Sequence, residues 1–213
     1  MKSIKPLFLA CLLMGVSGLL QAQNIETLFA KMPSSILPGI SAETRMDLID
    51  FYKNGKAAVM PAVFGGKVEL KVLANDYLLL KTSMNAAIQL KLLRQMDGSS
   101  VIVFVRTAAA PLKDSRIRCY DLAWKQVPAI AMPRLTPLDF LSDASKADAS
   151  MLESLALQRS RFFQTYSFEP NSTALIVRTS LKEELSLAVK DKLSPLLKDS
   201  VLFQFVNGRF VSN

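Results

Sequence analysis

The chain has 213 residues, of which 50% are apolar and 21% charged, and its formal net charge is +8 at pH 7. This composition is typical of a folded protein and excludes a disordered chain. The sequence contains no histidine, which excludes histidine-based nucleophile pairs, imidazole general bases and zinc sites with histidine ligands.

The first 22 residues have the three parts of a secretory signal peptide. Lys2 and Lys5 give a positive start, residues 6–20 are almost wholly apolar and uncharged, and Ala22 supplies a small residue before the predicted cleavage. A retained N-terminal anchor remains the alternative. No later segment reaches about 20 residues without a charge, so we expect no membrane-spanning helix after cleavage. The location predicted is the periplasm, the cell surface or the medium.

The two cysteines have different expected roles. Cys11 lies in the signal segment, where Phe8-Leu-Ala-Cys11 loosely resembles a lipidation box, so a lipoprotein is a further alternative. Cleavage leaves Cys119 as the single thiol, which excludes an intramolecular disulfide and thiolate metal clusters. Strand alternation places Cys119 on the inward face together with Ile117, and we expect a buried, inert thiol.

Two helices are predicted at the start of the mature chain. The first covers 24–32, and the second begins at the N-cap Ser41 and ends near Lys53. Glu43 and Asp47 lie on one stripe of the second helix together with Asp50, but no other ligand accompanies them. We therefore expect a solvated face there and no metal site.

A long β region follows. Alternating or continuous apolar runs predict strands over 57–64, 67–72, 77–82, 88–92, 101–105 and 116–120. Turn signals such as Gly65-Gly66 and Asp97-Gly98 separate the runs, and turns this short favour an antiparallel meander over crossover helices. Residues 101–105 are apolar at every position, which predicts a central strand.

Three prolines in residues 127–137 indicate a connector. Beyond it the sequence predicts a helix start at Thr136, a helix over 147–156 and a hairpin formed by 162–168 and 173–178. A capping box at Ser180 predicts a further helix, and the sequence predicts a strand over 201–206. We expect one α+β domain over 23–213; the alternative is two small lobes divided near 127–137.

The expected architecture is α+β, a mostly antiparallel sheet of six or more strands whose N-terminal and late helices cover one face. The other face would be wet or would meet a partner. The candidate binding residues on this reading are Lys67, Lys71, Lys91, Asp114, Ser115, Arg116 and Arg118.

No local pattern in the sequence indicates catalysis, and we expect no cofactor and no metal. No serine stands three residues before a lysine, and Gly65-Gly66 lies between strands, so neither a Ser-Lys motif nor a phosphate loop is present. The basic and aromatic run from Arg159 to Phe163 is predicted to be a strand that enters the core, so nucleic-acid binding is not expected. Asp199-Ser200-Val201 fits a short pattern for bacterial O-glycosylation, which stays a hypothesis.

Several motifs resemble a Bacteroidales family of exported proteins of unknown function. They are Leu28-Phe29, Arg45 to Asp50, Leu90 to Leu93, Asp97 to Ser99, Val101 to Thr107, Ala110 to Ser115, Tyr120, Trp124, Lys182 to Glu184 and Asn207 to Phe210. One departure is Val206, where the family usually has tryptophan. The resemblance implies a Gram-negative anaerobe of the gut or mouth and a periplasmic or surface location, and it implies no activity.

The sequence therefore favours a non-catalytic binding or accessory protein of the envelope, whose partner would be an envelope protein or an acidic glycan. The alternative is a hydrolase that uses carboxylates or a Ser-Lys pair brought together by the fold. A purely structural role in the envelope is the third hypothesis.

Overall fold

The computed structural model describes residues 24–63, 65–109, 111–128, 130, 135–143, 146–158 and 162–212. The predicted signal peptide over 1–22, including Cys11, lies outside the described residues, as does part of the predicted connector.

Seven strands form an antiparallel meander, the first sheet, in which each strand pairs with its neighbours in chain order. They are β1 (Val59–Pro61), β2 (Lys67–Leu73), β3 (Tyr77–Ser83), β4 (Ala86–Arg94), β5 (Ser100–Ala109), β6 (Lys113–Tyr120) and β7 (Gln126–Val127). The central strand β5 is buried on both faces at 101–105, because each face packs against a different layer.

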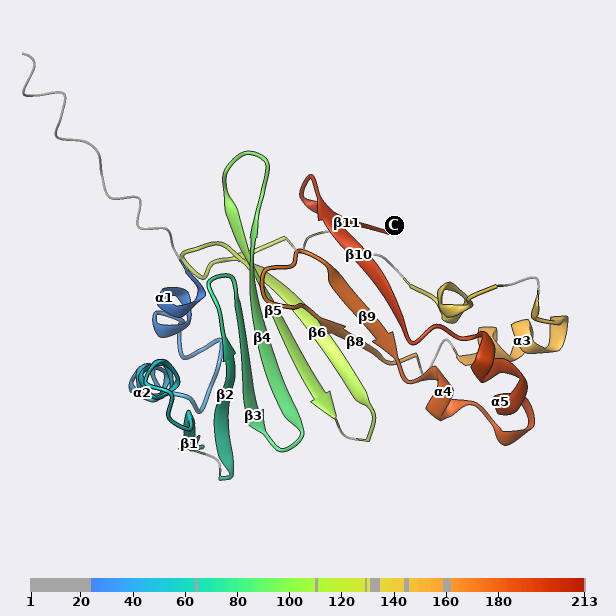
Figure 1. Ribbon diagram of the computed structural model, residues 1–213, viewed down its shortest axis with the longest axis horizontal. Coiled ribbons are helices and arrows are strands. Elements are labelled where there is room, and N and C mark those ends of the chain that lie inside the picture. The colour runs from blue at the N-terminus through green and yellow to red at the C-terminus, as the bar shows by residue number, and fades with distance from the viewer. Residues whose placement is uncertain are drawn as a thin grey trace, which may run out of the picture.

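Helices α1 (Ile25–Ala30) and α2 (Ala42–Lys53) pack on one face of this sheet (Figure 1). Their N-caps are Asn24 and Ser41, whose side-chain oxygens accept the backbone N–H groups of Thr27 and Thr44. The core between helices and sheet includes Phe29 from α1 and residues such as Leu80 and Ile88 from the strands. Apolar burial of this kind is the main stabilising term for the layer.

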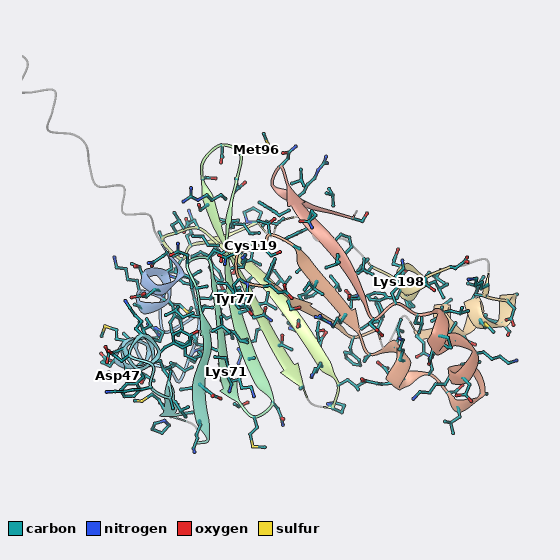
Figure 2. The ribbon with its side chains drawn as sticks, in the orientation of Figure 1. Asp47, Lys71, Tyr77, Met96, Cys119 and Lys198 are labelled. Atoms are coloured by element: carbon teal, nitrogen blue, oxygen red, sulfur yellow. The ribbon has the colours of Figure 1, made fainter. Side chains whose placement is uncertain are left out.

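A second, four-stranded sheet packs on the opposite face of the first (Figure 1). Its strands are β8 (Gln164–Ser167), β9 (Leu175–Thr179), β10 (Ser200–Val206) and β11 (Arg209–Ser212), arranged in the order β11-β10-β9-β8. The core between the sheets contains Tyr77 and Cys119, which Figure 2 shows in the middle of the molecule. The middle strands of the first sheet thus form an inner layer between the helices and the second sheet.

The late helices gather beyond one end of the second sheet (Figure 1). They are the 3-10 helix η2 (Pro137–Phe140), α3 (Ala149–Leu157), α4 (Leu181–Glu184), α5 (Leu187–Leu193) and the 3-10 helix η5 (Ser194–Leu196). The helix start predicted at Thr136 is confirmed, since Asp139 accepts hydrogen bonds from the Thr136 N–H and hydroxyl. No helix among the described residues is both long and apolar enough to cross a membrane.

The predicted α+β class with a mostly antiparallel sheet is confirmed, but three details are corrected. The late helices do not share a face with α1 and α2. The helix predicted from Ser180 is two short helices, because the backbone at Leu185 is extended and keeps that side chain buried. The face opposite α1 and α2 is not simply wet, because the second sheet covers much of it.

Candidate functional site

A cleft of about 830 Å³ opens beside β8, where the second sheet leaves part of the first uncovered. Its volume falls within the range of roughly 300–1,000 Å³ that is usual for ligand pockets. It is lined by residues of β3, β4, β5, β6, β8 and β9, by the β3–β4 turn and by the start of α4. The cleft is therefore built by the packing of the two sheets.

The floor of the cleft includes a row of residues that face one another across three strands, and Ser115 of the next strand continues the row below the surface. Lys81 of β3 pairs with Ala87 of β4, Ala87 with Thr107 of β5, and Thr107 with Ser115 of β6. The hydroxyl oxygens of Thr107 and Ser115 lie 2.7 Å apart and share a hydrogen bond. Residues paired across antiparallel strands point to the same face, so this row presents the Lys81 amine, the Ala87 methyl group and the Thr107 hydroxyl to the cleft.

One wall of the cleft is the edge strand β8, which β4 holds in place through Gln89. The side-chain amide of Gln89 donates to the carbonyl oxygen of Tyr166 at 3.3 Å and accepts the N–H of Phe168 at 3.0 Å. The hydroxyl of Tyr77 donates to the Gln89 oxygen at 3.3 Å. Gln89 is 9% exposed, and these three bonds satisfy its buried amide.

A second link joins β4 to the same segment behind the cleft. The Lys91 amine donates to an Asp76 carboxylate oxygen at 2.5 Å and to the carbonyl oxygen of Glu169 at 2.9 Å. The other Asp76 oxygen accepts the N–H of Asn171 at 3.2 Å. Since Lys91 is completely buried, this ion pair fixes the β8–β9 connection to the first sheet.

The charges around the cleft are mainly positive. Lys81, Lys113 and Arg178 line it, against Glu183 as the single carboxylate among its described lining residues. The Arg178 guanidinium donates to the Ser167 hydroxyl at 3.0 Å and keeps further N–H groups available. Hydroxyl groups and a cationic rim suit a ligand that carries carboxylates or other anionic groups.

The structure separates the binding residues predicted from the sequence. Lys67 and Lys71 are exposed on β2, and Lys71 pairs with Glu69 at 2.6 Å. Arg116 and Arg118 are also exposed, but they alternate with Ser115 and therefore lie on the opposite face of β6. The expectation of one basic face is wrong for these two arginines.

Lys91, Ser115 and Asp114 also differ from their expected setting. The Lys91 side chain lies on the face of β4 that alternation predicts. The second sheet covers that face, however, and Lys91 is buried. Ser115 is buried, bonds to Thr107 and does not itself line the cleft. The charge of Asp114 acts on Tyr166, whose pKa is raised chiefly by burial and further by this carboxylate.

The cleft residues that sequence reasoning did not identify include Lys81, Gln89, Lys113 and Arg178. Lys81 and Gln89 lie within strands that the sequence predicts. Alternation alone could have placed both side chains on the face away from the helices. Arg178 comes from the second sheet, and no sequence signal shows which face of the first sheet it approaches.

Burial changes the acid–base chemistry of two groups between the sheets. It raises the pKa of the Cys119 thiol, which agrees with the inert thiol predicted. It also raises the pKa of Tyr77 to about 12, with a smaller contribution from the charge of Glu169. Both groups are neutral at pH 7, as a closed apolar interface requires.

The Tyr77 shift predicts a loss of stability in alkali. The unfolded chain releases this proton near pH 10, whereas the folded protein keeps it until about pH 12. The stabilisation is therefore complete below pH 10 and is lost as the pH rises from 10 to 12, by about 3 kcal/mol in all. Urea unfolding at pH 9 and 11.5 measures it. The fall should be smaller in Tyr77→Phe; an equal fall in both proteins would contradict this assignment.

Two comparisons connect this architecture to known proteins, and among curated proteins none matches the sequence. A domain of an uncharacterized protein from Porphyromonas gingivalis W83 is similar in structure, with a TM-score of 0.73 and 25% identity. The similarity covers 88% of this chain and 96% of that one. The family model described as Protein of unknown function (DUF3256) matches residues 17–210. The resemblance to a Bacteroidales family of unknown function is thus confirmed, and the chain belongs to the family of proteins of unknown function DUF3256.

Proposed function

We propose that this protein is an exported, non-catalytic binding protein whose inter-sheet cleft takes a ligand bearing carboxylate groups. One observation carries the proposal: three cationic side chains and hydroxyl residues such as Thr107, Thr165 and Ser167 line a cleft of about 830 Å³ that contains one described carboxylate. Export is supported by the signal-like pattern of residues 1–22. An acidic glycan and an acidic protein segment share the chemistry that this cleft would recognise.

The composition of the cleft favours binding over hydrolysis. Hydrolysis of glycosides commonly uses two carboxyl groups on either side of the scissile bond. Glu183 has no second carboxylate beside it among the described residues that line the cleft. The cationic groups, by contrast, come from three different strands and converge on one space, as expected of a site that holds an anion.

A charge-removal experiment tests the proposal. Hexaglutamate and tri-galacturonate, each with a fluorescent label, are titrated with residues 23–213 at 50 mM and 500 mM NaCl. We expect the double variant Lys113→Gln/Arg178→Gln to bind about tenfold more weakly at low salt, since each exposed ion pair contributes up to about 1 kcal/mol and 1.4 kcal/mol is a factor of ten. High salt should reduce the difference, because screening shortens the range of these charges.

The matched control removes the same charge from the other face of β6. Arg116→Gln/Arg118→Gln should change the dissociation constant less than twofold, because both arginines are exposed on the face turned away from the cleft. Equal weakening by the two double variants would show binding to general surface charge and would contradict the proposal. So would the absence of binding to either probe at millimolar concentration.

A further inference from the structure

The free edge of β8 is the feature of the cleft that points to a particular ligand. β8 is the last strand in the order of the second sheet, and β9 is its partner on one side. The bonds from Gln89 reach the carbonyl of Tyr166 and the N–H of Phe168, so these groups point toward the cleft. In an antiparallel strand alternate residues direct N–H and C=O to the same edge. The N–H and C=O of Gln164 therefore point to the same edge of β8, next to Thr165 in the cleft lining.

Side chains of β4 cover this edge over only part of its length. Lys91 bonds to the carbonyl of Glu169, and Gln89 bonds to Phe168 and Tyr166. The next residue of β4 on the same face is Ala87, whose methyl group cannot form a hydrogen bond. Among the described residues no side chain bonds to the N–H of Tyr166 or to the backbone groups of Gln164, which lie along the same edge.

We propose that the ligand of the cleft is an extended acidic peptide that adds a strand to β8 over Ala87. Strand addition to an exposed sheet edge is a general mode of peptide recognition, in which backbone bonds give affinity and alternate side chains give specificity. Lys81 lies directly beside Ala87 in the floor, and Lys113 and Arg178 line the same cleft. Acidic side chains at alternate positions would meet these cations. The inference rests on the proposed function and names the ligand class of the same site.

The peptide backbone provides a direct test. The probes are acetyl-Glu-Val-Glu-Val-Glu-Val-amide, the same peptide with every backbone amide N-methylated, and tri-galacturonate. The first two carry equal charge, but N-methylation removes the donors that pair with a strand edge. We expect the unmodified peptide to bind at least tenfold more tightly than either of the others. It should also slow hydrogen exchange at the N–H groups of Gln164 and Tyr166, which NMR measures residue by residue.

A variant whose own side chain occupies the free edge of β8 gives an independent test. Ala87→Gln should place a second amide beside Gln89, cover the free groups of β8 and weaken peptide binding at least tenfold without changing any charge. Ala108→Gln is the matched control, because Ala108 is exposed on the other face of β5. It should leave binding unchanged.

The outcomes separate this inference from the proposed function. Equal binding of the N-methylated peptide, tighter binding of tri-galacturonate, or unchanged exchange at Gln164 and Tyr166 would overturn strand addition and leave the anionic cleft standing. Failure of all three probes to bind would overturn both. Loss of binding in Ala87→Gln together with protection of the two amides would establish strand addition.

Discussion

Replacing Lys91 with alanine is expected to lower the free energy of unfolding by about 3 kcal/mol. The amine is completely buried and holds Asp76 at 2.5 Å and the carbonyl of Glu169 at 2.9 Å. Its removal leaves a carboxylate and a carbonyl without their shared donor, at the point where the β8–β9 connection meets the first sheet. We place the loss at the low end of the range for broken buried pairs because the Asp76 side chain is 28% exposed.

Urea unfolding followed by the fluorescence of Trp124 measures this loss. Lys71→Ala is the matched control, because Lys71 forms an ion pair of similar length with Glu69 on the surface. An exposed pair contributes about 0–1 kcal/mol, so the control should cost at most that amount. Similar losses in the two variants would show that burial of the Lys91 pair adds nothing to stability.

Local patterns were sufficient to predict most elements of the fold. The alternation of Lys67 to Val72 identified a strand, the continuous apolar run of Val101 to Val105 identified a central strand, and both exist. The short turns correctly indicated a meander. Each of these signals lies in a run of neighbouring residues, because hydrophobic periodicity and turn chemistry are properties of short segments.

The division into two sheets could not be predicted in the same way. The strands β9 and β10 pair across about 20 residues that include two α-helices and a 3-10 helix, and nothing in either strand specifies that partner. Lys91 shows the consequence: alternation gave its face correctly, but the face of a strand does not reveal which layer covers it. A lysine in an alternating strand was therefore interpreted as solvated when it forms a buried ion pair.

The cleft was harder still to predict, because its residues come from six strands and have no common motif. The decisive pair is Gln89 and Ala87, an amide and a methyl group two positions apart in β4. Their role in the cleft depends on the edge of β8, a strand that follows more than 70 residues later in the chain. The excess of basic residues in the sequence has the same sign as most charged side chains of the cleft.

The fold also depends on an arginine that the sequence did not single out for structure. Arg45 on α2 is 1% exposed, and its guanidinium donates to the carbonyl oxygens of Ile40 at 2.7 Å and Met32 at 2.5 Å. It also reaches the carbonyl of Ala30, the last residue of α1, at 3.5 Å. The last carbonyls of a helix have no partner within the helix. Arg45, on α2, supplies a hydrogen-bond donor to a terminal carbonyl of α1. Burial lowers the pKa of its guanidinium.

We expect Arg45→Met to lower the free energy of unfolding by about 3 kcal/mol, since two well-bonded carbonyls would lose their donor and each buried unpaired group costs roughly 1–3 kcal/mol. The apolar side chain keeps much of the packing, so the loss reports the hydrogen bonds. Lys53→Met is the control on the same helix, where the lysine is 57% exposed and pairs with Glu26; it should cost at most about 1 kcal/mol. Hydrogen exchange should also accelerate in α1 of Arg45→Met and stay unchanged in the control. Equal stability of the two variants, with α1 equally protected, would show that Arg45 does not connect the two helices.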